Sequence, residues 1–269
     1  MTCACGQNHA TGPHDCDGGG APVALPAPMI ALTGRLVCAD AGQMMTVLGH
    51  VQDHVDLSRA EAGNLRFDLW QDDDPLIWHL SELFRDEAAF AAHRARTADS
   101  IWGHETAQIA RDFDRHEVMP ALRPEQPSDR DPIDSLLAAA FDGPSEAALV
   151  RQLRADEDLS LSLVAIAAGR LLGHLALSPI AADRPALALA PVAVHPRAQG
   201  LGIGSALIRA ALDHAGDRPV VVLGDPAYYS RFGFRPADLK SPYAGPCLQV
   251  AGDLPDGTTI AHAPAFATI

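Results

Sequence analysis

The residues best suited to chemistry lie in one glycine-rich segment, Gln199–Gly204. Gly200, Gly202 and Gly204 follow a strand-like apolar run that ends at Val194 and lead directly into a run with helical spacing. Because glycine has no side chain, the backbone here can approach an anion closely. Free N–H groups and the dipole at a helix start suit a pyrophosphate. The segment therefore predicts a pyrophosphate-binding turn; a strand-to-helix turn without a ligand is the structural alternative.

A dinucleotide-binding turn is the rival chemistry for this segment. Such turns have the spacing G-x-G-x-x-G and follow the first strand of a βαβ unit. The spacing here is GLGIG, and the segment comes late in a series of strands that looks antiparallel. The pattern therefore argues against a dinucleotide.

Two motifs in this half resemble the GNAT-type N-acetyltransferases. Gln199–Gly204 resembles the family's Q/R-x-x-G-x-G/A motif, and Tyr229–Phe234 resembles the Y-x-x-F-G-F pattern of the helix after its fifth strand. The resemblance extends from about residue 122 to residue 269 and includes the closing HAPAF. It implies a GNAT mixed-sheet acyltransferase fold with acetyl-CoA as co-substrate, in which an amine of the substrate attacks the thioester directly.

The resemblance also assigns roles to particular residues. Tyr229 is the expected catalytic acid, since a phenol with a pKa near 10 can give its proton to a departing thiolate; core packing is the alternative for Tyr228 and Tyr229. A backbone N–H near Val194 would polarise the thioester carbonyl. The main chain of the preceding strand would pair with the pantetheine arm. The expected cofactor-binding residues are Val192, Ala193, Val194, Gln199, Gly200, Leu201, Gly202, Ile203, Gly204 and Ser205.

The general base and the amine acceptor are less clearly indicated. Glu146, His174 and His195 are candidates for the base, with ordinary structural roles as the alternative. In the GNAT family, variable loops select the acceptor, and Phe141–Leu153 and Ser178–Ala186 are the corresponding segments. Nothing in them points to a peptide, an antibiotic or a polyamine.

The elements around these residues indicate a separate domain over residues 119–269. Pro120–Pro132 is rich in proline and charge and marks its start. Apolar spacing predicts helices over 133–141 and 145–153, strands over 161–168, 170–178 and 187–194, the helix over 202–215 and a buried strand over 219–224.

Residues 29–118 predict a different domain. Strand-like runs at 29–39, 65–71, 76–84 and 109–118 alternate with helical spacing that begins at Asp40 and at Asp86. The order βαββαβ is that of a ferredoxin-like α+β unit.

This first domain resembles the antibiotic-biosynthesis-monooxygenase (ABM) family of small dimeric α+β barrels. The matching residues are Glu61–Phe67, Glu82 and the helix that ends at His93. The family implies a homodimer and includes cofactor-free oxygenases that act on quinol-like substrates. In such an oxygenase, His93, Asn64 and Trp102 would line the pocket, with His93 taking a proton or binding iron. The alternative is that the tryptophans are core aromatics and His93 caps its helix.

Composition limits the remaining possibilities. The net charge of −14 argues against nucleic-acid and anionic-membrane partners. The chain has neither a membrane-spanning apolar run nor a secretory signal, so a cytoplasmic location is expected. Residues 1–28 predict a flexible tail. A metal bound by Cys3, Cys5, His9, His14 and Cys16 is possible but matches no standard zinc spacing.

Three hypotheses of function follow from these patterns. The leading one is an acetyl-CoA-dependent N-acetyltransferase whose ABM-like domain provides dimerisation or a second activity. The second is a non-catalytic acyl-CoA sensor, which would keep the glycine-rich turn but would not need Tyr229. The third makes the first domain a quinol-type monooxygenase.

Overall fold

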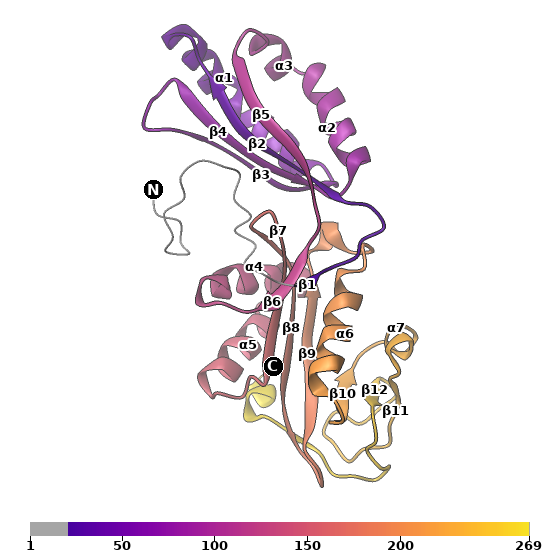
Figure 1. The fold of residues 1–269 in the computed structure, drawn as a ribbon. Coiled ribbons are helices and arrows are strands. Elements are labelled where there is room, and N and C mark those ends of the chain that lie inside the picture. Colours follow the sequence, from indigo (N-terminus) through magenta and orange to yellow (C-terminus); the bar gives the residue numbers. More distant parts are fainter. Residues whose placement is uncertain (1–20, 269) are drawn as a thin grey trace. The chain divides into compact units, whose positions relative to one another are not determined.

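The structure of the chain is a computed structural model, and it describes residues 21–268. The described chain forms two units, each with its own sheet. Of the described residues, 24–119 form the first unit, and 21–23 together with 120–268 form the second. Each unit is described by itself below (Figure 1).

The first unit is a four-stranded antiparallel sheet with its helices on one face (Figure 1). The strand order in the sheet is β3-β4-β2-β5. The predicted βαββαβ order is confirmed, with one additional short helix, α3, before the last strand. The elements are β2 (Met29–Val37), α1 (Ala41–Ala60), β3 (Asn64–Gln71), β4 (Ile77–Phe84), α2 (Glu87–Ala98), α3 (Ile101–Glu105) and β5 (Ala110–Val118).

Both long helices of this unit begin at an aspartate, as the sequence predicts. The Asp40 carboxylate accepts a hydrogen bond from the Gln43 amide (3.0 Å), and the Asp86 carboxylate accepts one from the Ala89 amide (2.8 Å). These caps satisfy amides that have no partner within the helix. They fix the residue at which each helix begins after the preceding strand.

The second unit is built on a nine-stranded mixed sheet. Its strand order is β1-β6-β7-β8-β9-β10-β12-β11, and β13 pairs with β8. Helices α4 and α5 lie on one face and α6 on the other (Figure 1). The strands are β1 (Ala21–Pro22), β6 (Ala121–Pro124), β7 (Leu161–Ala167), β8 (Arg170–Ala181), β9 (Ala186–Val194), β10 (Val220–Leu223), β11 (Arg235–Pro236), β12 (Leu248–Ala251) and β13 (Ala261–His262). The α-helices are α4 (Arg130–Phe141), α5 (Ser145–Ala155), α6 (Ile203–Ala215) and α7 (Pro226–Tyr229), and the 3-10 turns are η1 (Pro127–Asp129), η2 (Pro196–Ala198), η3 (Ser230–Phe232) and η4 (Pro264–Thr268).

The segment that precedes the first unit in the sequence, residues 21–23, belongs to the second unit. Strand β1 pairs with β6, with Pro22 opposite Ala121, and the Val23 amide donates to the Pro120 carbonyl (2.8 Å). Val23 is 3% exposed. The expectation of a structureless tail up to residue 28 is therefore wrong for residues 21–23. Two residues are too few to show a strand period in the sequence, and their partner strand lies a hundred residues away.

Strands β9 and β10 diverge, and their divergence opens the sheet. They pair in parallel only at Leu187–Val220 and Ala188–Val221. Beyond Ala188, β9 continues beside β8 alone, as far as Val194. One edge of β9 is therefore unpaired along its last residues.

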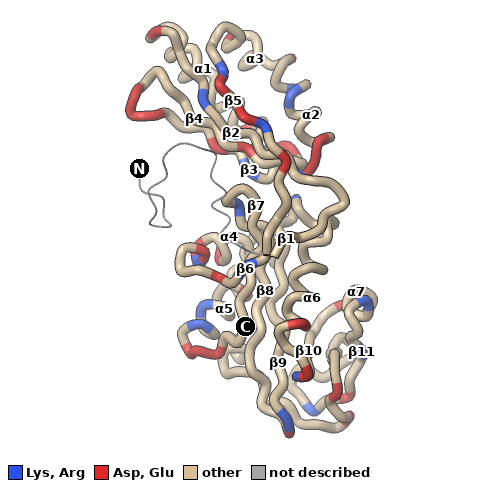
Figure 2. The backbone as a smooth tube through the Cα atoms, viewed as in Figure 1, with Lys and Arg blue, Asp and Glu red and all other residues tan. Residues whose placement is uncertain are grey.

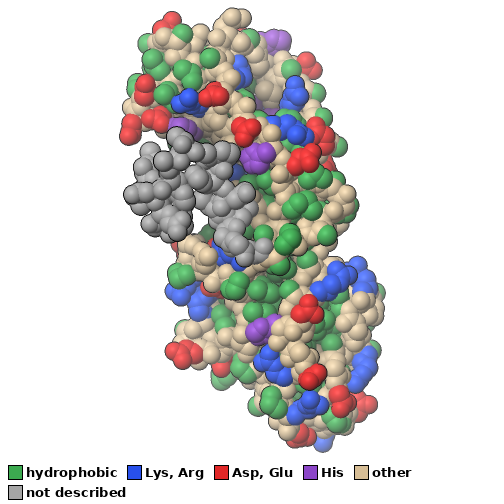
Figure 3. Space-filling model, viewed as in Figure 1, with side chains coloured by type: hydrophobic (Ala, Val, Ile, Leu, Met, Phe, Trp, Pro, Cys, Tyr) green, Lys and Arg blue, Asp and Glu red, His purple; other side chains and the backbone are tan. Residues whose placement is uncertain are grey.

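Basic and acidic residues are interspersed along the backbone of both units (Figure 2). On the face drawn in Figure 3, apolar, acidic and basic side chains occur in small neighbouring groups. Among the described residues, no helix is both long and apolar enough to cross a membrane.

Candidate functional site

The glycine-rich turn of the second unit connects β9 to α6 as predicted. Gly200 and Gly202 have φ angles of +81° and +95°, which side-chain-bearing residues rarely adopt. At Gly204 the space for a side chain is tight. A methyl group there would lie 3.1 Å from the Tyr228 hydroxyl and 3.3 Å from Val194 Cγ2. The three glycines thus set the direction of the turn and the close packing of the helix start on β9.

Backbone amides are available along this turn. The first helical hydrogen bond of α6 runs from the Ala206 amide to the Gly202 carbonyl (3.0 Å). Within the described part of the chain, the amides from Gly200 to Ser205 donate to no backbone acceptor. The Gln199 amide differs, since it donates to the Pro196 carbonyl (3.4 Å). The free donors therefore begin at Gly200, one residue later than the sequence suggests.

These residues line a cavity of about 510 Å³, named here the loop cavity. Strand β9, the turn and the start of α6 form most of its wall, and α7 and η3 complete it. Its lining residues are Val192, Val194, Ala198, Gln199, Gly200, Gly202, Ile203, Gly204, Ser205, Tyr228, Tyr229 and Arg231. Of the ten residues predicted to bind the cofactor, only Ala193 and Leu201 are outside this set.

The end of β9 offers main-chain groups to the opening between the strands. The His195 amide donates to the Leu172 carbonyl (2.8 Å), so His195 and Leu172 form a hydrogen-bonded pair of the ladder. In an antiparallel ladder, hydrogen-bonded and non-bonded pairs alternate. The main-chain groups of Ala193 are therefore directed to β8, and those of Val192 and Val194 to the side from which β10 has diverged. The Val194 carbonyl there accepts from the Gln199 side chain (3.4 Å).

Tyr229, the predicted catalytic acid, lies beside the opening. Burial raises its pKa to about 12, with a smaller contribution from Tyr228. Its ring fits against Gly224, where a methyl group would lie 2.3 Å from Tyr229 Cε2. Within residues 21–268, the Tyr229 hydroxyl has no hydrogen-bond partner, and it is not a buried unsatisfied atom. The phenol is therefore protonated at neutral pH and accessible.

Arg231 is a loop-cavity residue that the sequence analysis missed. Its guanidinium stacks over the Tyr228 ring at 4.3 Å, and its Nε donates to the Tyr228 carbonyl (3.1 Å). The side chain is exposed and lines the loop cavity, so its charge is accessible to solvent there. Arg231 lies within the segment that matches Y-x-x-F-G-F, and its position between Tyr229 and Phe232 is the signal that could have identified it.

A second cavity of about 230 Å³, named here the α5 cavity, adjoins the first. Val192 and Tyr229 line both cavities. The remaining residues of the α5 cavity are Phe141, Glu146, Leu149, Ala188, Leu189, Ala190, Pro191, Val221, Leu223, Tyr243, His262 and Phe266. The predicted acceptor segment Phe141–Leu153 contributes three of them, whereas Ser178–Ala186 contributes none.

The three candidate bases occupy different environments. Glu146 lines the α5 cavity. His174 is fully buried, bonded to Ser162 Oγ (3.0 Å), and burial lowers its pKa to about 4. His195 accepts from the Arg197 amide (3.3 Å) and lines neither cavity. Of the three candidates, only Glu146 lines one of the two cavities. His262, which no sequence motif distinguished as a base, also lines the α5 cavity.

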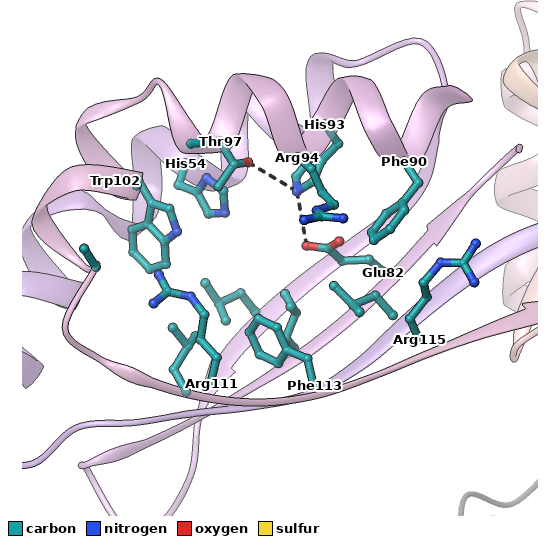
Figure 4. Close-up of a pocket in the computed structure, with 17 residues that line it drawn as sticks. His54, Glu82, Phe90, His93, Arg94, Thr97, Trp102, Arg111, Phe113 and Arg115 are labelled. Carbon is teal, nitrogen blue, oxygen red and sulfur yellow. Dashed lines mark hydrogen bonds and ion pairs between the residues drawn. The ribbon is translucent and has the colours of Figure 1, made fainter. Parts of the chain in front are cut away.

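The first unit has a cavity of its own, of about 510 Å³, between its sheet and helices (Figure 4). Its wall is mostly apolar. Glu82, on β4, is 2% exposed and points into this region beside His93 (Figure 4). Burial and the charge of Glu61 raise the pKa of Glu82 to about 8. A carboxylic acid that keeps its proton at neutral pH therefore lies on the cavity wall.

His93 is held between two carboxyl groups. Its Nδ1 lies 2.9 Å from Glu61 Oε2, and its Nε2 lies 3.6 Å from Glu82 Oε1. Arg96 binds the other oxygen of Glu61. Desolvation lowers the pKa of His93 despite the hydrogen bond to Glu61. A neutral His93 that donates from Nδ1 to Glu61 would direct its Nε2 lone pair towards Glu82 and Thr97 (Figure 4).

Of the predicted first-unit pocket residues, His93 and Trp102 line the cavity. Asn64 does not, because it lies at the end of β3, opposite Phe84, where a register shift interrupts the strand. The sequence analysis missed His54, whose ring stacks on Trp102 at 4.5 Å. The metal hypothesis for the tail falls on residues 3–16, which lie outside the described residues.

Comparisons with known proteins agree with the family resemblance of each half of the chain. The family model of the acetyltransferase (GNAT) family matches residues 130–234, and that of antibiotic biosynthesis monooxygenase matches residues 29–98. The uncharacterised N-acetyltransferase YhbS of Escherichia coli K12 is 40% identical over 134 residues, which is 46% of this chain and 80% of YhbS. The chain belongs to the GNAT family of N-acetyltransferases, and the predicted fusion with an ABM-like domain is confirmed.

Three solved structures are similar to parts of this chain. YhbS from Escherichia coli in complex with CoA has 33% identity and a TM-score of 0.49, covering 55% of this chain and 92% of YhbS. A GNAT acetyltransferase from Brucella melitensis in complex with acetyl-CoA has 38% identity and a TM-score of 0.47, covering 55% and 97%. A putative antibiotic biosynthesis monooxygenase from Nitrosomonas europaea has 21% identity and a TM-score of 0.30, covering 35% and 92%.

Proposed function

We propose that the second unit transfers the acetyl group of acetyl-CoA to an amine of a small molecule. The observation that carries the proposal is that the amides from Gly200 to Ser205 are free and that all of these residues except Leu201 line the loop cavity. Amides and the dipole at the start of α6 attract a pyrophosphate together. The open edge of β9 at Val192 and Val194 leads from there to Tyr229, so the pantetheine arm follows that edge.

The chain's residues then have distinct tasks in the transfer. The Val194 N–H donates to the thioester oxygen as negative charge develops on it. The Tyr229 hydroxyl gives its proton to the departing thiolate. Although burial raises the pKa of Tyr229, the same desolvation penalises the thiolate, so the proton moves between two groups that are destabilised alike.

Calorimetric titration with acetyl-CoA tests the turn. Gly202→Leu places a side chain in the turn, and we expect binding to weaken by about 100-fold or more. Gly216→Leu is the matched control. Gly216 ends the same helix, has a φ of +59°, and like Gly202 would have no atom within 4 Å of an added Cβ. Equal affinity in the two variants would refute the turn as the pyrophosphate site.

Thiol release from acetyl-CoA over an amine panel distinguishes the enzyme from an acyl-CoA sensor. An enzyme releases free CoA thiol in proportion to acetylated amine, whereas a sensor binds acetyl-CoA without turnover. Membership of the GNAT family supports the enzyme. Binding without release over the whole panel would favour the sensor.

The first-unit cavity supports a second candidate function, a quinol-type monooxygenase. The supporting observation is the contact between a protonated Glu82 and a neutral His93 at the wall of an apolar cavity. Such a His93 can take a proton from a hydroxyl group of a quinol. Oxygen uptake with quinols tests this function, and His93→Ala should abolish it. Uptake that is absent, or equal in the variant, leaves the unit a structural or dimerisation role.

We also propose a homodimer formed through the first unit, as its family resemblance implies. Light scattering during size-exclusion chromatography measures the mass directly. A mass of one chain at micromolar concentration contradicts the dimer.

A further inference from the structure

Within the acetyltransferase unit, the α5 cavity and the loop cavity meet at Val192 and Tyr229. The amides that suit the pyrophosphate are on the loop side of this meeting point. The other side is lined by residues of α4, α5, β9 and β10 and of the C-terminal segment. If acetyl-CoA enters along the loop cavity, as proposed above, its thioester reaches the boundary and the amine must attack from the α5 cavity.

The α5 cavity is small and mostly apolar. Its volume of about 230 Å³ lies below the roughly 300–1,000 Å³ of pockets that take drug-sized ligands. Ten of its fourteen lining residues have hydrocarbon side chains. The four polar ones are Glu146, Tyr229, Tyr243 and His262. These dimensions fit a compact amine with an apolar body better than a polyamine or a peptide side chain with its backbone.

Two of the four polar side chains already have a hydrogen-bond partner or a proposed role. The Tyr243 hydroxyl donates to the Phe266 carbonyl (2.9 Å), and Tyr229 is assigned to the leaving thiolate. Glu146 and His262 remain. Neither has a hydrogen-bond or ion-pair partner among the described residues. A carboxylate and an imidazole without partners therefore face the cavity into which the amine must fit.

His262 is held in place although its ring makes no hydrogen bond. Its strand, β13, pairs with β8, which sets His262 opposite Ile180. The rings of Tyr243 and Phe266 pack against it, each with a centroid at 5.1 Å. Its Nδ1 is fully buried without a partner, whereas Nε2 is not among the buried atoms that lack one. Since Nε2 has no protein partner either, it is the ring nitrogen accessible from the cavity.

We infer that His262 is the general base of the acetyl transfer and that the acceptor is a small primary amine with an apolar body, whose cationic form Glu146 attracts into the α5 cavity. This inference rests on the function proposed above. The ammonium group first loses one proton to solvent, and the resulting neutral amine forms the N–C bond as the C–S bond breaks. The nitrogen, which becomes positively charged, gives one proton to His262 Nε2. The thiolate takes the proton of Tyr229, and solvent returns both side chains to their starting states. The products are the acetamide and the free thiol of CoA.

The protonation state of His262 agrees with this task. Burial lowers its pKa from the ordinary value near 6.5, so the imidazole is neutral at pH 7 and can accept a proton. The other titratable groups that face the cavity are Glu146 on α5, Tyr229 on α7 and Tyr243. Because the pKa is lowered, kcat should stay high at neutral pH and fall only as the pH drops through the lowered pKa of His262.

The test measures thiol release with acetyl-CoA and 2-phenylethylamine, isobutylamine, spermidine and a lysine-containing peptide as acceptors. We expect the two apolar amines to give the highest kcat/KM. His262→Gln should lower kcat about 100-fold and remove the acidic inflection of the kcat profile. Glu146→Gln should chiefly raise the KM of the amine. His214→Gln, an exposed histidine on α6, is the control and should behave like the wild-type protein.

Two further measurements separate the possible failures. Added imidazole should partly restore His262→Ala, which a purely structural role of His262 would not allow. Acetyl-CoA titration of His262→Gln should give the wild-type affinity. If the wild-type protein turns over while His262→Gln keeps its kcat and its acidic inflection, the base is wrong. A preference for spermidine or the peptide refutes the acceptor class. Absence of turnover in the wild-type protein refutes the proposed function instead.

Discussion

At the scale of single residues, Tyr229 is partly buried, packs its ring against Gly224 and lines both cavities of the acetyltransferase unit. We expect Tyr229→Phe to lower kcat by about 100-fold or more, because the thiolate must then leave without a nearby acid. The affinity for acetyl-CoA should stay unchanged, since the amides of the turn are untouched. Thiol-release kinetics and calorimetry measure the two quantities. An unchanged kcat would return Tyr229 to a packing role.

Glu82 is the corresponding residue of the first unit. Its pKa in the folded state is raised to about 8, so the folded chain keeps a proton that the unfolded chain loses above about pH 4.5. The free energy of unfolding must then fall as the pH rises towards 8. His93, whose pKa is lowered, has the opposite effect, but only below its ordinary value near 6.5.

We therefore expect the free energy of unfolding to fall by about 1 kcal/mol between pH 7 and pH 8 in the wild-type protein. Glu82→Gln, which has no proton to lose, should show no such decline. Denaturant titration followed by tryptophan emission measures this in the first unit, because Trp70, Trp78 and Trp102 all lie there. A parallel decline in the variant would show that another group titrates.

The candidate site residues that could be predicted from the sequence are those that lie within one continuous segment of the chain. The glycine-rich turn and Tyr229 belong to contiguous motifs whose spacing already carries the geometry. His262, the proposed base, could not be predicted from the sequence, because the pairing of β13 with β8 and two ring contacts bring it to the α5 cavity. The stacking of His54 on Trp102 likewise depends on the packing of α1 against α3.

At the scale of elements, the turn between β10 and α7 sets the orientation of Tyr229. Gly224 is essential there, because a methyl group would lie 2.3 Å from the Tyr229 ring. We expect Gly224→Ala to displace the ring and to lower kcat about 10-fold or more, through loss of proton transfer. The same thiol-release assay measures it.

A double variant makes this prediction specific. If Gly224 acts through the Tyr229 hydroxyl, Gly224→Ala should cost little further kcat in the Tyr229→Phe background. Full additivity would mean that the two residues act separately. Gly49→Ala is the control, since Gly49 lies in α1 and a methyl group there would meet no atom within 4 Å. It should leave kcat unchanged.

Long periodic elements were predictable, and short ones were not. Both long helices of the first unit follow from their aspartate caps and apolar spacing. Strands β1, β11 and β13 have two residues each and carry no period. They exist because a neighbouring strand supplies their hydrogen bonds. The divergence of β9 from β10 also has no local signature.

At the scale of the whole molecule, residues 21–23 belong to the unit that follows the first one. We expect Val23→Asp to destabilise the acetyltransferase unit by about 2–4 kcal/mol, because it buries a charge at a position that is 3% exposed. Thermal loss of acetyltransferase activity should shift to lower temperature. The tryptophan transition of the first unit should not move, and equal shifts in both would show that the units unfold together.

The pairing of β1 with β6 also implies an order in which the two units can fold during translation. Strand β1 leaves the ribosome about a hundred residues before its partner, which corresponds to roughly 5–20 s at ordinary rates of translation. During that interval all the strands of the first unit are made, so that unit can complete its sheet while β1 waits unpaired. This side of the acetyltransferase sheet is completed only afterwards, when β6 has been made and pairs with β1, which then forms the edge.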